Sequence, residues 1–251
     1  MKRCLYGALV VSVCIALWWI AAAIANSVLL PTPDKALQGM LSILGSTSGL
    51  KHIWITTCRV LVGMAIGATF GIILGVATRY SRFIEAVVRL VIYPVIHSVP
   101  TLCWVMIFAL WFGYSNITPV LTIAVSVAPF FVINIWEGMK ELDLSLVEMS
   151  EMYTRKRMLV LGKVIMPMLY PYVFAATRSA FMTAWKAAIP AEIFGAGSGM
   201  GYEISNAFGG YRFAQVFGWT LIFAFILISF DNGLFRYFDR KYIRKWKPVG
   251  K

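Results

Sequence analysis

The chain has 251 residues, of which 60% are apolar and only 14% are charged, and its formal net charge is +12. Soluble domains are about 45–50% apolar and about 25% charged, whereas the mean hydropathy of this chain is +0.76. A soluble domain of this length could not bury so much apolar surface, so the composition excludes a soluble enzyme, a disordered chain and a disulfide scaffold. We therefore expect a polytopic membrane protein.

The N-terminus has two basic residues, Lys2 and Arg3, followed by an apolar run over residues 4–25. The same pattern also suits a secretory signal peptide with Ala23-Ile24-Ala25 as its cleavage site. The apolar core of a signal peptide, however, has about 7–15 residues, and this run is long enough to cross a bilayer. The pattern favours an uncleaved first membrane span.

The chain contains a series of apolar segments that are each long enough to cross about 30 Å of hydrocarbon as a helix. In lipid the backbone must satisfy its own hydrogen bonds, so isolated apolar runs of this kind form helices. The sequence therefore predicts an all-α fold with six transmembrane helices, at residues 4–25, 58–78, 86–112, 118–136, 172–194 and 214–235.

The basic residues indicate the orientation of these six spans. If the N-terminus is inside, the basic residues gather on the inner side, and the outer segments carry only Lys35, Lys51 and Arg212. Because basic residues favour cytoplasmic loops, we expect both termini in the cytoplasm. The positive charge then reflects this bias toward cytoplasmic loops, so we expect membrane lipid and no nucleic acid as a partner.

This orientation divides one transmembrane domain, residues 1–251, into functional parts. They are a first span with an outer segment (1–57), core spans (58–235), a cytoplasmic loop within them (137–171) and a basic cytoplasmic tail (236–251). In the outer segment we expect an amphipathic helix over residues 34–45, capped by Thr32 or Asp34. Its apolar face comprises Ala36, Leu37, Met40, Leu41 and Leu44.

The second span contains four glycines spaced four residues apart, which places them on one face of the helix. They are Gly63, Gly67, Gly71 and Gly75. Small residues in this pattern let another helix approach closely. The neighbouring helix could belong to the same chain or to another subunit, and the face could also line a transport path.

The third span contains Pro94 and Pro100, which flank the polar residues His97 and Ser98 and precede Thr101. Proline removes a backbone hydrogen bond and kinks a helix. The kink could simply be tolerated, or it could mark a substrate cavity, because irregular backbone at membrane depth lines protein or water.

The fifth span contains three charged residues, Arg178, Lys186 and Glu192, with Pro190 bending or ending the helix. Charged residues within spans are costly, and they are candidates for a functional role. An anionic substrate could meet Arg178 or Lys186, or these cations could pair with Glu192 or Asp231. The four cysteines and two histidines form no ligand-like pattern, so we expect no metal site.

The inner segment 137–171 is too polar to span a membrane, but it has a helical pattern of apolar residues. We expect two short amphipathic helices, separated by a basic turn at residues 154–157. The apolar stripe includes Leu142, Leu146, Met149, Met152 and Tyr153. Such a hairpin suits the docking of a partner protein, and it equally suits a surface position near lipid headgroups.

This loop resembles the EAA loop of permease subunits of ATP-binding-cassette importers. That pattern contains Glu, any residue, Ala, three residues, Gly, nine residues, an aliphatic residue, two residues and Pro. Glu148 and Pro167 fall at the family spacing, Ser150 replaces the alanine, and Thr154 replaces the glycine that serves the turn. The matching region contains Glu148, Ser150, Thr154, Arg155, Lys156, Arg157 and Pro167.

Further stretches are similar to one subfamily, the permeases for sulfonates, taurine, nitrate, bicarbonate and some vitamin precursors. These stretches are Leu30-Pro31-Thr32-Pro33, residues 59–63, 94–100 and 111–113, and residues 191–202. The resemblance covers nearly the whole chain.

The resemblance implies a MetI-like fold and a role as the permease subunit of an importer in a bacterial-type inner membrane. In this family two permease subunits, often identical, form the path for the substrate. Two separate ATPase subunits bind the EAA loops and use ATP and Mg²⁺, and an external binding protein delivers the substrate. Glu148 would then anchor or cap the coupling helix. The candidate path residues are His97, Ser98, Thr101, Arg178, Lys186 and Glu192.

The sequence contains no Gly-x-x-x-x-Gly-Lys-Ser/Thr loop, so we expect no ATPase activity and no bound cofactor in this chain. A secondary transporter driven by an ion gradient is the main alternative, although the chain shows no convincing repeated halves. An intramembrane enzyme is a weaker alternative, because no span contains His-x-x-x-His or Gly-x-Ser-x-Gly.

Overall fold

The computed structural model describes residues 2–25, 28–142, 144–154 and 156–235, and these residues are almost entirely helical. Helix covers each of the six apolar segments. The elements are α1 (Lys2–Ala25), α2 (Pro33–Leu44), α3 (Thr47–Tyr80), α4 (Arg82–Val87), η1 (Val88–Ile92), α5 (Tyr93–Ser98), α6 (Thr101–Phe112), α7 (Ile117–Lys140), α8 (Leu144–Tyr153), α9 (Arg157–Val160), η2 (Leu161–Ile165), α10 (Met166–Gly195), α11 (Met200–Gly209), α12 (Phe213–Ser229) and η3 (Phe230–Phe235).

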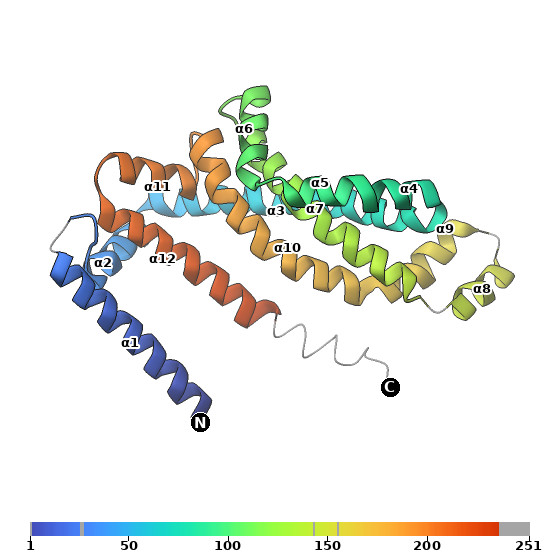
Figure 1. Ribbon diagram of the computed structural model, residues 1–251, viewed down its shortest axis with the longest axis horizontal. Helices are drawn as coiled ribbons and strands as arrows, with labels where there is room; N and C mark the ends of the chain where they lie inside the picture. Colours follow the sequence, from blue (N-terminus) through green and yellow to red (C-terminus); the bar gives the residue numbers. More distant parts are fainter. Residues whose placement is uncertain (1, 26–27, 143, 155, 236–251) are drawn as a thin grey trace.

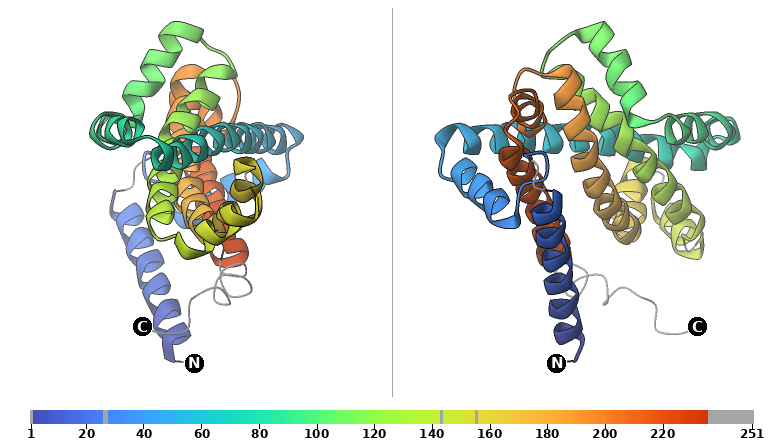
Figure 2. Two further views of the ribbon diagram at one scale, coloured as in Figure 1. Left: turned by 90° about the vertical axis from the view of Figure 1, so that its right-hand side faces the viewer. Right: turned by 60° about the vertical axis from the view of Figure 1, so that its left-hand side comes forward.

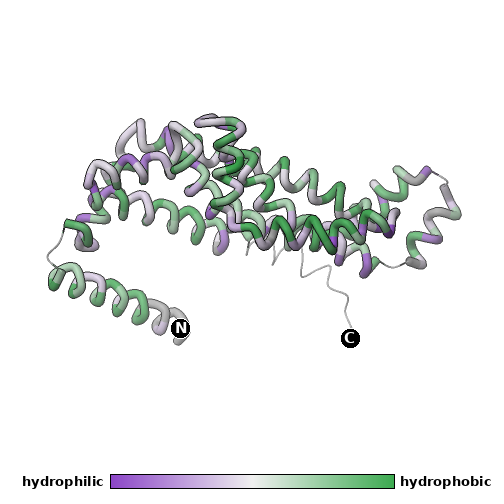
Figure 3. The backbone as a smooth tube through the Cα atoms, turned by 45° about the horizontal axis from the view of Figure 1, so that its top comes forward, coloured by the Kyte–Doolittle hydropathy of each residue, from purple (hydrophilic) through white to green (hydrophobic). Residues whose placement is uncertain are grey.

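Three long helices form the body of the molecule: α7 packs between α3 and α10. They run along the long axis in Figure 1, with α8 and α9 at one end and α2 and α11 at the other. We refer to these as the hairpin end and the α11 end. Figure 2 shows that α1 and α6 extend away from this body in opposite directions. In Figure 3, apolar residues run along the long helices and polar residues gather toward the two ends.

The glycine row of α3 lies at the contact between α3 and α7. A Cβ atom added to any of Gly63, Gly67, Gly71 and Gly75 would lie less than 3.0 Å from atoms of α7. The opposing residues include Ile123, Val127, Phe131 and Ile135. The absence of side chains therefore lets the backbones of two helices of the same chain approach closely.

The described residues contain three helices that are long and apolar enough to cross a membrane: Thr47–Tyr80, Ile117–Lys140 and Met158–Gly195. The count becomes four if Arg82–Ile96 and Thr101–Phe112 form one broken span. Two further apolar helices, Leu9–Ala25 and Phe213–Ser229, are shorter. The predicted total of six spans therefore remains a prediction.

The third predicted span, residues 86–112, is not one kinked helix, because its two halves meet at 90°. The bend lies between α5 and α6, where Val99 is extended and Pro100 is the N-cap of α6. Proline disfavours helical geometry at the residue before it, which explains the position of the break.

The prolines at the start of the fifth predicted span and within it do not end the helix. Pro171 and Pro190 both lie inside α10, which continues to Gly195, so of the two effects expected at Pro190, a bend or an end of the helix, the end is wrong. On its N-terminal side α10 continues from α9 through the π-helical turn η2. Pro167 lies in the first turn of α10, directly after this turn. A π turn accommodates the hydrogen bond that proline cannot make.

The helix predicted at residues 34–45 is α2, but its buried face differs from the expected one. The buried residues are Ala36, Gly39 and Ile43, whereas Leu37 and Leu41 are exposed. Gly39 determines this orientation, because its Cα lies against the backbone of Ala214 in α12. Thr32 occupies the N-cap without bonding the backbone, and its hydrogen bond to Asp34 lowers the pKa of that carboxyl group.

Candidate functional site

The hairpin end displays an apolar surface on α8. Leu142 and Val147 are buried in a small core with α9 and α10. The rest of the predicted stripe points outward: Leu146 and Met149 are about half exposed, and Met152 and Tyr153 are each 87% exposed. We call these four residues the α8 surface. Glu148 lies exposed among them.

Thr154 forms the turn after α8 without the backbone conformation that favours glycine. Among the described non-glycine residues only Tyr211 has a positive φ. The Thr154 N–H donates to the carbonyl of Ser150 at 3.2 Å, and its hydroxyl accepts from the N–H of Lys156 at 3.3 Å. The family pattern has glycine at this position, and here the side chain of Thr154 supports the turn with a hydrogen bond.

The remaining predicted loop residues lie around this turn. Ser150 donates its hydroxyl hydrogen to the carbonyl of Val147 at 2.7 Å. Lys156 is exposed. Arg155 lies outside the described residues, and the side chain of Arg157 is outside the description as well.

A buried ion pair lies near the α11 end, between Arg59 of α3 and Glu192 of α10. Arg59 Nη1 donates to Glu192 Oε1 at 2.8 Å, and the side chains are 5% and 0% exposed. The guanidinium group also donates to the carbonyl of Ser198 at 2.6 Å, to the Ser198 hydroxyl at 2.8 Å and to Asn116 Oδ1. Such hydrogen bonds are what make a buried charge pair tolerable.

The carboxylate of Glu192 organises the segment that leads into α11. Glu192 Oε2 accepts from the N–H of Gly201 at 3.0 Å and from the Thr56 hydroxyl at 2.9 Å. Thr56 in turn accepts from the N–H of Met200 at 2.8 Å. Gly199 has a φ of +108°, and a Cβ atom there would overlap the Glu192 carboxylate. This position therefore requires glycine.

His52 contributes a second link at the same end. Its Nδ1 accepts from the N–H of Gly199 at 3.0 Å, and its Nε2 lies 3.4 Å from Glu203 Oε1. The sequence showed no partner for His52, because both contacts join residues that are far apart in the chain.

The other charges of α10 have different surroundings. Arg178 pairs with Asp231, at 2.8 Å between Nη2 and Oδ1. Lys186 is exposed and makes no ion pair with any described residue. Of the two pairings that the sequence left open, the one with Asp231 is found for Arg178, and the one between Glu192 and a cation of its own span is wrong, since Arg59 of α3 pairs with Glu192. The one sequence signal that could have indicated the pairing of Arg59 with Glu192 is that Arg59 itself lies within a predicted span.

The bend in the third predicted span borders a cavity of about 180 Å³. Thr101 lines it, whereas Ser98 is exposed and the side chain of His97 is outside the description. The predicted path residues whose side chains are described therefore have different surroundings: Thr101 lines the cavity, whereas Arg178 and Glu192 are engaged in ion pairs. The cavity lies between α5, α6, α7 and α10 and is lined by Tyr93, Ile96, Val99, Thr101, Trp104, Ser126, Pro129, Phe130, Ile133 and Thr183.

The described residues form long apolar helices, a broken helix beside a cavity and a hairpin that exposes apolar side chains on α8. These features are those of a multi-pass membrane protein of the transporter class. The model of the binding-protein-dependent transport system inner membrane component matches residues 67–244, more than half of the chain. The chain belongs to this family. It is therefore the permease component of an ATP-binding-cassette importer in the inner membrane, not itself the ATPase, and the family works with an ATPase that uses ATP and with a binding protein.

The sequence is similar to named relatives over most of its length. It is 28% identical to the "Putative aliphatic sulfonates transport permease protein SsuC" of Bacillus subtilis, over 96% of this chain and 87% of that protein. It is also 28% identical to the nitrate import permease protein NrtB of Synechococcus elongatus, over 77% of this chain and 73% of that protein.

The fold is similar to that of a solved structure. A chain in a structure of the MetNI methionine ABC transporter superposes with a TM-score of 0.61, over 82% of this chain and 97% of that chain, at 18% identity. This similarity establishes the predicted MetI-like, all-α fold.

Proposed function

We propose that two copies of this chain form the translocation path of an importer for a small anion, with two ATPase subunits docked on their hairpins. Each copy would cross the membrane six times with both termini in the cytoplasm, which places the hairpin end inside and the α11 end outside. The substrate would be an organic or inorganic anion, such as the aliphatic sulfonates and nitrate that appear in the names of the relatives.

The α8 surface is the observation that carries this proposal. Four large apolar side chains on one short helix are exposed, beside Glu148 and the basic turn. Apolar anchors that fill a groove contribute most of the energy of such contacts, and charges at the rim steer the approach. The hairpin core also connects α8 with α10, so a movement of the docked ATPases would be transmitted directly to a spanning helix.

Transport then requires two conformations of the spans, and ATP and the loaded binding protein can drive the change only by binding the two conformations with different affinity. Glu148 would anchor the coupling helix against a basic residue of the ATPase. Residues Ser150, Thr154, Arg155, Lys156, Arg157 and Pro167 would shape the turn and the second half of this docking element.

The test is a detergent pull-down of this chain, co-expressed with its neighbouring genes, followed by an assay of ATP hydrolysis. The variant Glu148→Lys with Arg155→Glu is expected to lose the ATPase and still insert. A matched control, Asp34→Lys with Lys35→Glu, reverses two charges on the exposed start of α2 at the opposite end, and it is expected to keep the ATPase.

Two results would contradict the proposal. Full retention of the ATPase by the Glu148 and Arg155 variant would exclude the hairpin as the docking site. Capture of no ATPase at all, together with uptake that follows an ion gradient, would support the secondary transporter instead.

A further inference from the structure

Lys186 is a charged side chain that no described residue pairs with. It lies nine residues before the end of α10, about 14 Å along the helix. The other charges of this helix within the predicted span are neutralised, since Arg178 pairs with Asp231 and Glu192 pairs with Arg59. Charged residues at membrane depth almost always face a water-filled cavity or the interior of a bundle. The exposed face of α10 around Lys186 is therefore unsuited to lipid.

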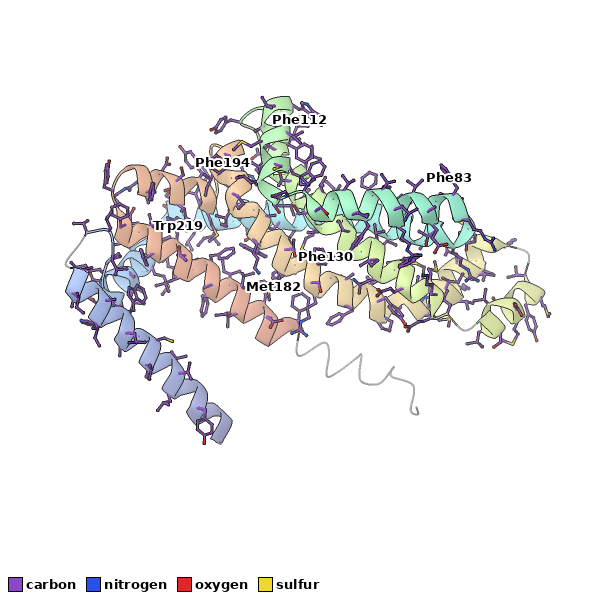
Figure 4. The ribbon with its side chains drawn as sticks, viewed as in Figure 1. Phe83, Phe112, Phe130, Met182, Phe194 and Trp219 are labelled. Atoms are coloured by element: carbon purple, nitrogen blue, oxygen red, sulfur yellow. The ribbon has the colours of Figure 1, made fainter. Side chains whose placement is uncertain are left out.

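The same face of α10 borders the cavity at the broken helix. Thr183 lines the cavity and precedes Lys186 by three residues, so the two side chains are neighbours on the helix surface. In Figure 4, Phe130 of α7 and Met182 of α10 lie near the middle of the long axis, away from both ends of the body. Phe130 is itself a lining residue.

The part of the cavity lining that the structure describes offers hydrogen-bond donors and no carboxylate. Trp104 Nε1 and Ser126 Oγ are buried, and neither has a hydrogen-bond partner within the described residues. An indole N–H can only donate, and a buried donor without a partner calls for a ligand or another explanation. Thr101 is the first residue of α6, so the N-terminal end of that helix, which carries a partial positive charge, lies at the cavity. None of the described lining residues is charged.

We propose that this cavity, with Lys186 at its edge, holds the anionic group of the substrate during its passage through the membrane. The inference rests on the proposed function and names its substrate class, which is a small monovalent oxyanion such as a sulfonate or nitrate. Trp104 and Ser126 donate to its oxygens, Lys186 supplies the positive charge, and Tyr93 and Phe130 form the apolar wall. Arg59 and Arg178 are not substrate ligands, because each already forms an ion pair with a carboxylate of this chain.

The test uses the thiol of a Thr183→Cys variant as a reporter of charge and water at the cavity. The four native cysteines are replaced, and the purified complex in detergent is treated with an anionic sulfonatoethyl or a cationic trimethylammonium-ethyl methanethiosulfonate. Adding Lys186→Met is expected to slow the anionic reagent by about fivefold, the effect of one unit charge at contact distance in water, and to accelerate the cationic reagent. Lys186→Arg is expected to restore the wild-type ratio.

Two further arms complete the experiment. Ethanesulfonate and nitrate are each expected to protect Thr183→Cys from modification, and uncharged dimethyl sulfone is not. Ile73→Cys, on an exposed apolar position of α3, is the control for a surface covered by detergent, and it is expected to stay unmodified. Thr101→Cys, in α6, provides a second reporter in the cavity lining.

The outcomes separate this inference from the proposed function. The anion site is overturned if neither Thr183→Cys nor Thr101→Cys is modified. It is also overturned if the modification rates do not change when Lys186 is replaced. Capture of the ATPase is measured on the same preparations. If the ATPase is captured and the Lys186 effect is absent, the importer stands and the site is wrong. If the ATPase is not captured and the Lys186 effect is present, the anion site is supported and transport uses an energy source other than this ATPase.

Discussion

Arg59 donates from Nη1 to Glu192 Oε1 at 2.8 Å, and this pair joins the first half of α3 to the last turns of α10. Both side chains are almost fully buried. Because Ser198, Asn116 and Gly201 bond to the same two groups, the pair also holds the start of α7 and the segment leading into α11. A single pair thus fixes the geometry of four elements at the α11 end.

Arg59→Met is expected to destabilise the protein by about 3 kcal/mol, because it leaves the Glu192 carboxylate buried without a counter-charge. Adding Glu192→Gln is expected to recover part of the loss, since no buried charge then remains. The measurement is thermal unfolding of the detergent-solubilised protein. Arg178→Met is the control: it breaks a pair whose side chains are 42% and 29% exposed, so a loss of at most about 1 kcal/mol is expected. Equal losses for the two arginines would contradict this view of the buried pair.

Gly199→Ala tests how tightly the Glu192 carboxylate is enclosed. A methyl group there would overlap the carboxylate, and the φ of +108° is itself strained for alanine. We expect a loss of about 1–3 kcal/mol, seen as a lower unfolding temperature. Gly197→Ala, two residues earlier, is the matched control, because an added Cβ meets nothing within 4 Å. If both variants unfold at the wild-type temperature, the segment adapts more freely than its hydrogen bonds imply.

Apolar periodicity alone predicted the helical segments, because in lipid the choice of secondary structure depends on hydrophobicity and backbone hydrogen bonding. It did not predict the 90° bend before Thr101, the uninterrupted passage of α10 through Pro190 or the buried face of α2. Each of these depends on tertiary contacts, such as that of Gly39 with Ala214, which the local pattern does not contain.

The candidate site was predictable where its signal is local. The spacing from Glu148 to Pro167 identified the hairpin, whose elements are contiguous in the sequence. The partner of Glu192 was not predictable, since Arg59 lies on another helix and pairs through the packing of α3, α7 and α10. The separation of Lys186 from its neutralised neighbours likewise emerges only from the assembled helices.

Gly67→Ala tests the contact between α3 and α7 without changing charge or polarity. The added methyl group would lie less than 3.0 Å from the Val127 side chain and the carbonyl of Ala124, so the two backbones must separate. Overpacking of this kind costs about 1–3 kcal/mol, and a lower unfolding temperature is expected. Gly162→Ala, which meets nothing within 4 Å, is expected to leave the unfolding temperature unchanged or slightly raised. If Gly67→Ala leaves the unfolding temperature unchanged, the contact between α3 and α7 has room for the added methyl group.

Met152→Asp tests whether the α8 surface contributes to ATPase docking. The side chain is 87% exposed, so the substitution is expected to leave the fold and the unfolding temperature unchanged. A charge placed in an apolar contact is expected to weaken ATPase binding by at least about fivefold, since removing one central anchor costs more than about 1 kcal/mol. The measurement is the ATPase concentration that half-saturates the immobilised permease. Tyr114→Asp places the same charge on an exposed aromatic residue between α6 and α7 and is expected to bind the ATPase normally. If Met152→Asp binds as tightly as wild type, the ATPase contacts another part of the hairpin, and the exposed methionine is explained by contact with lipid headgroups instead.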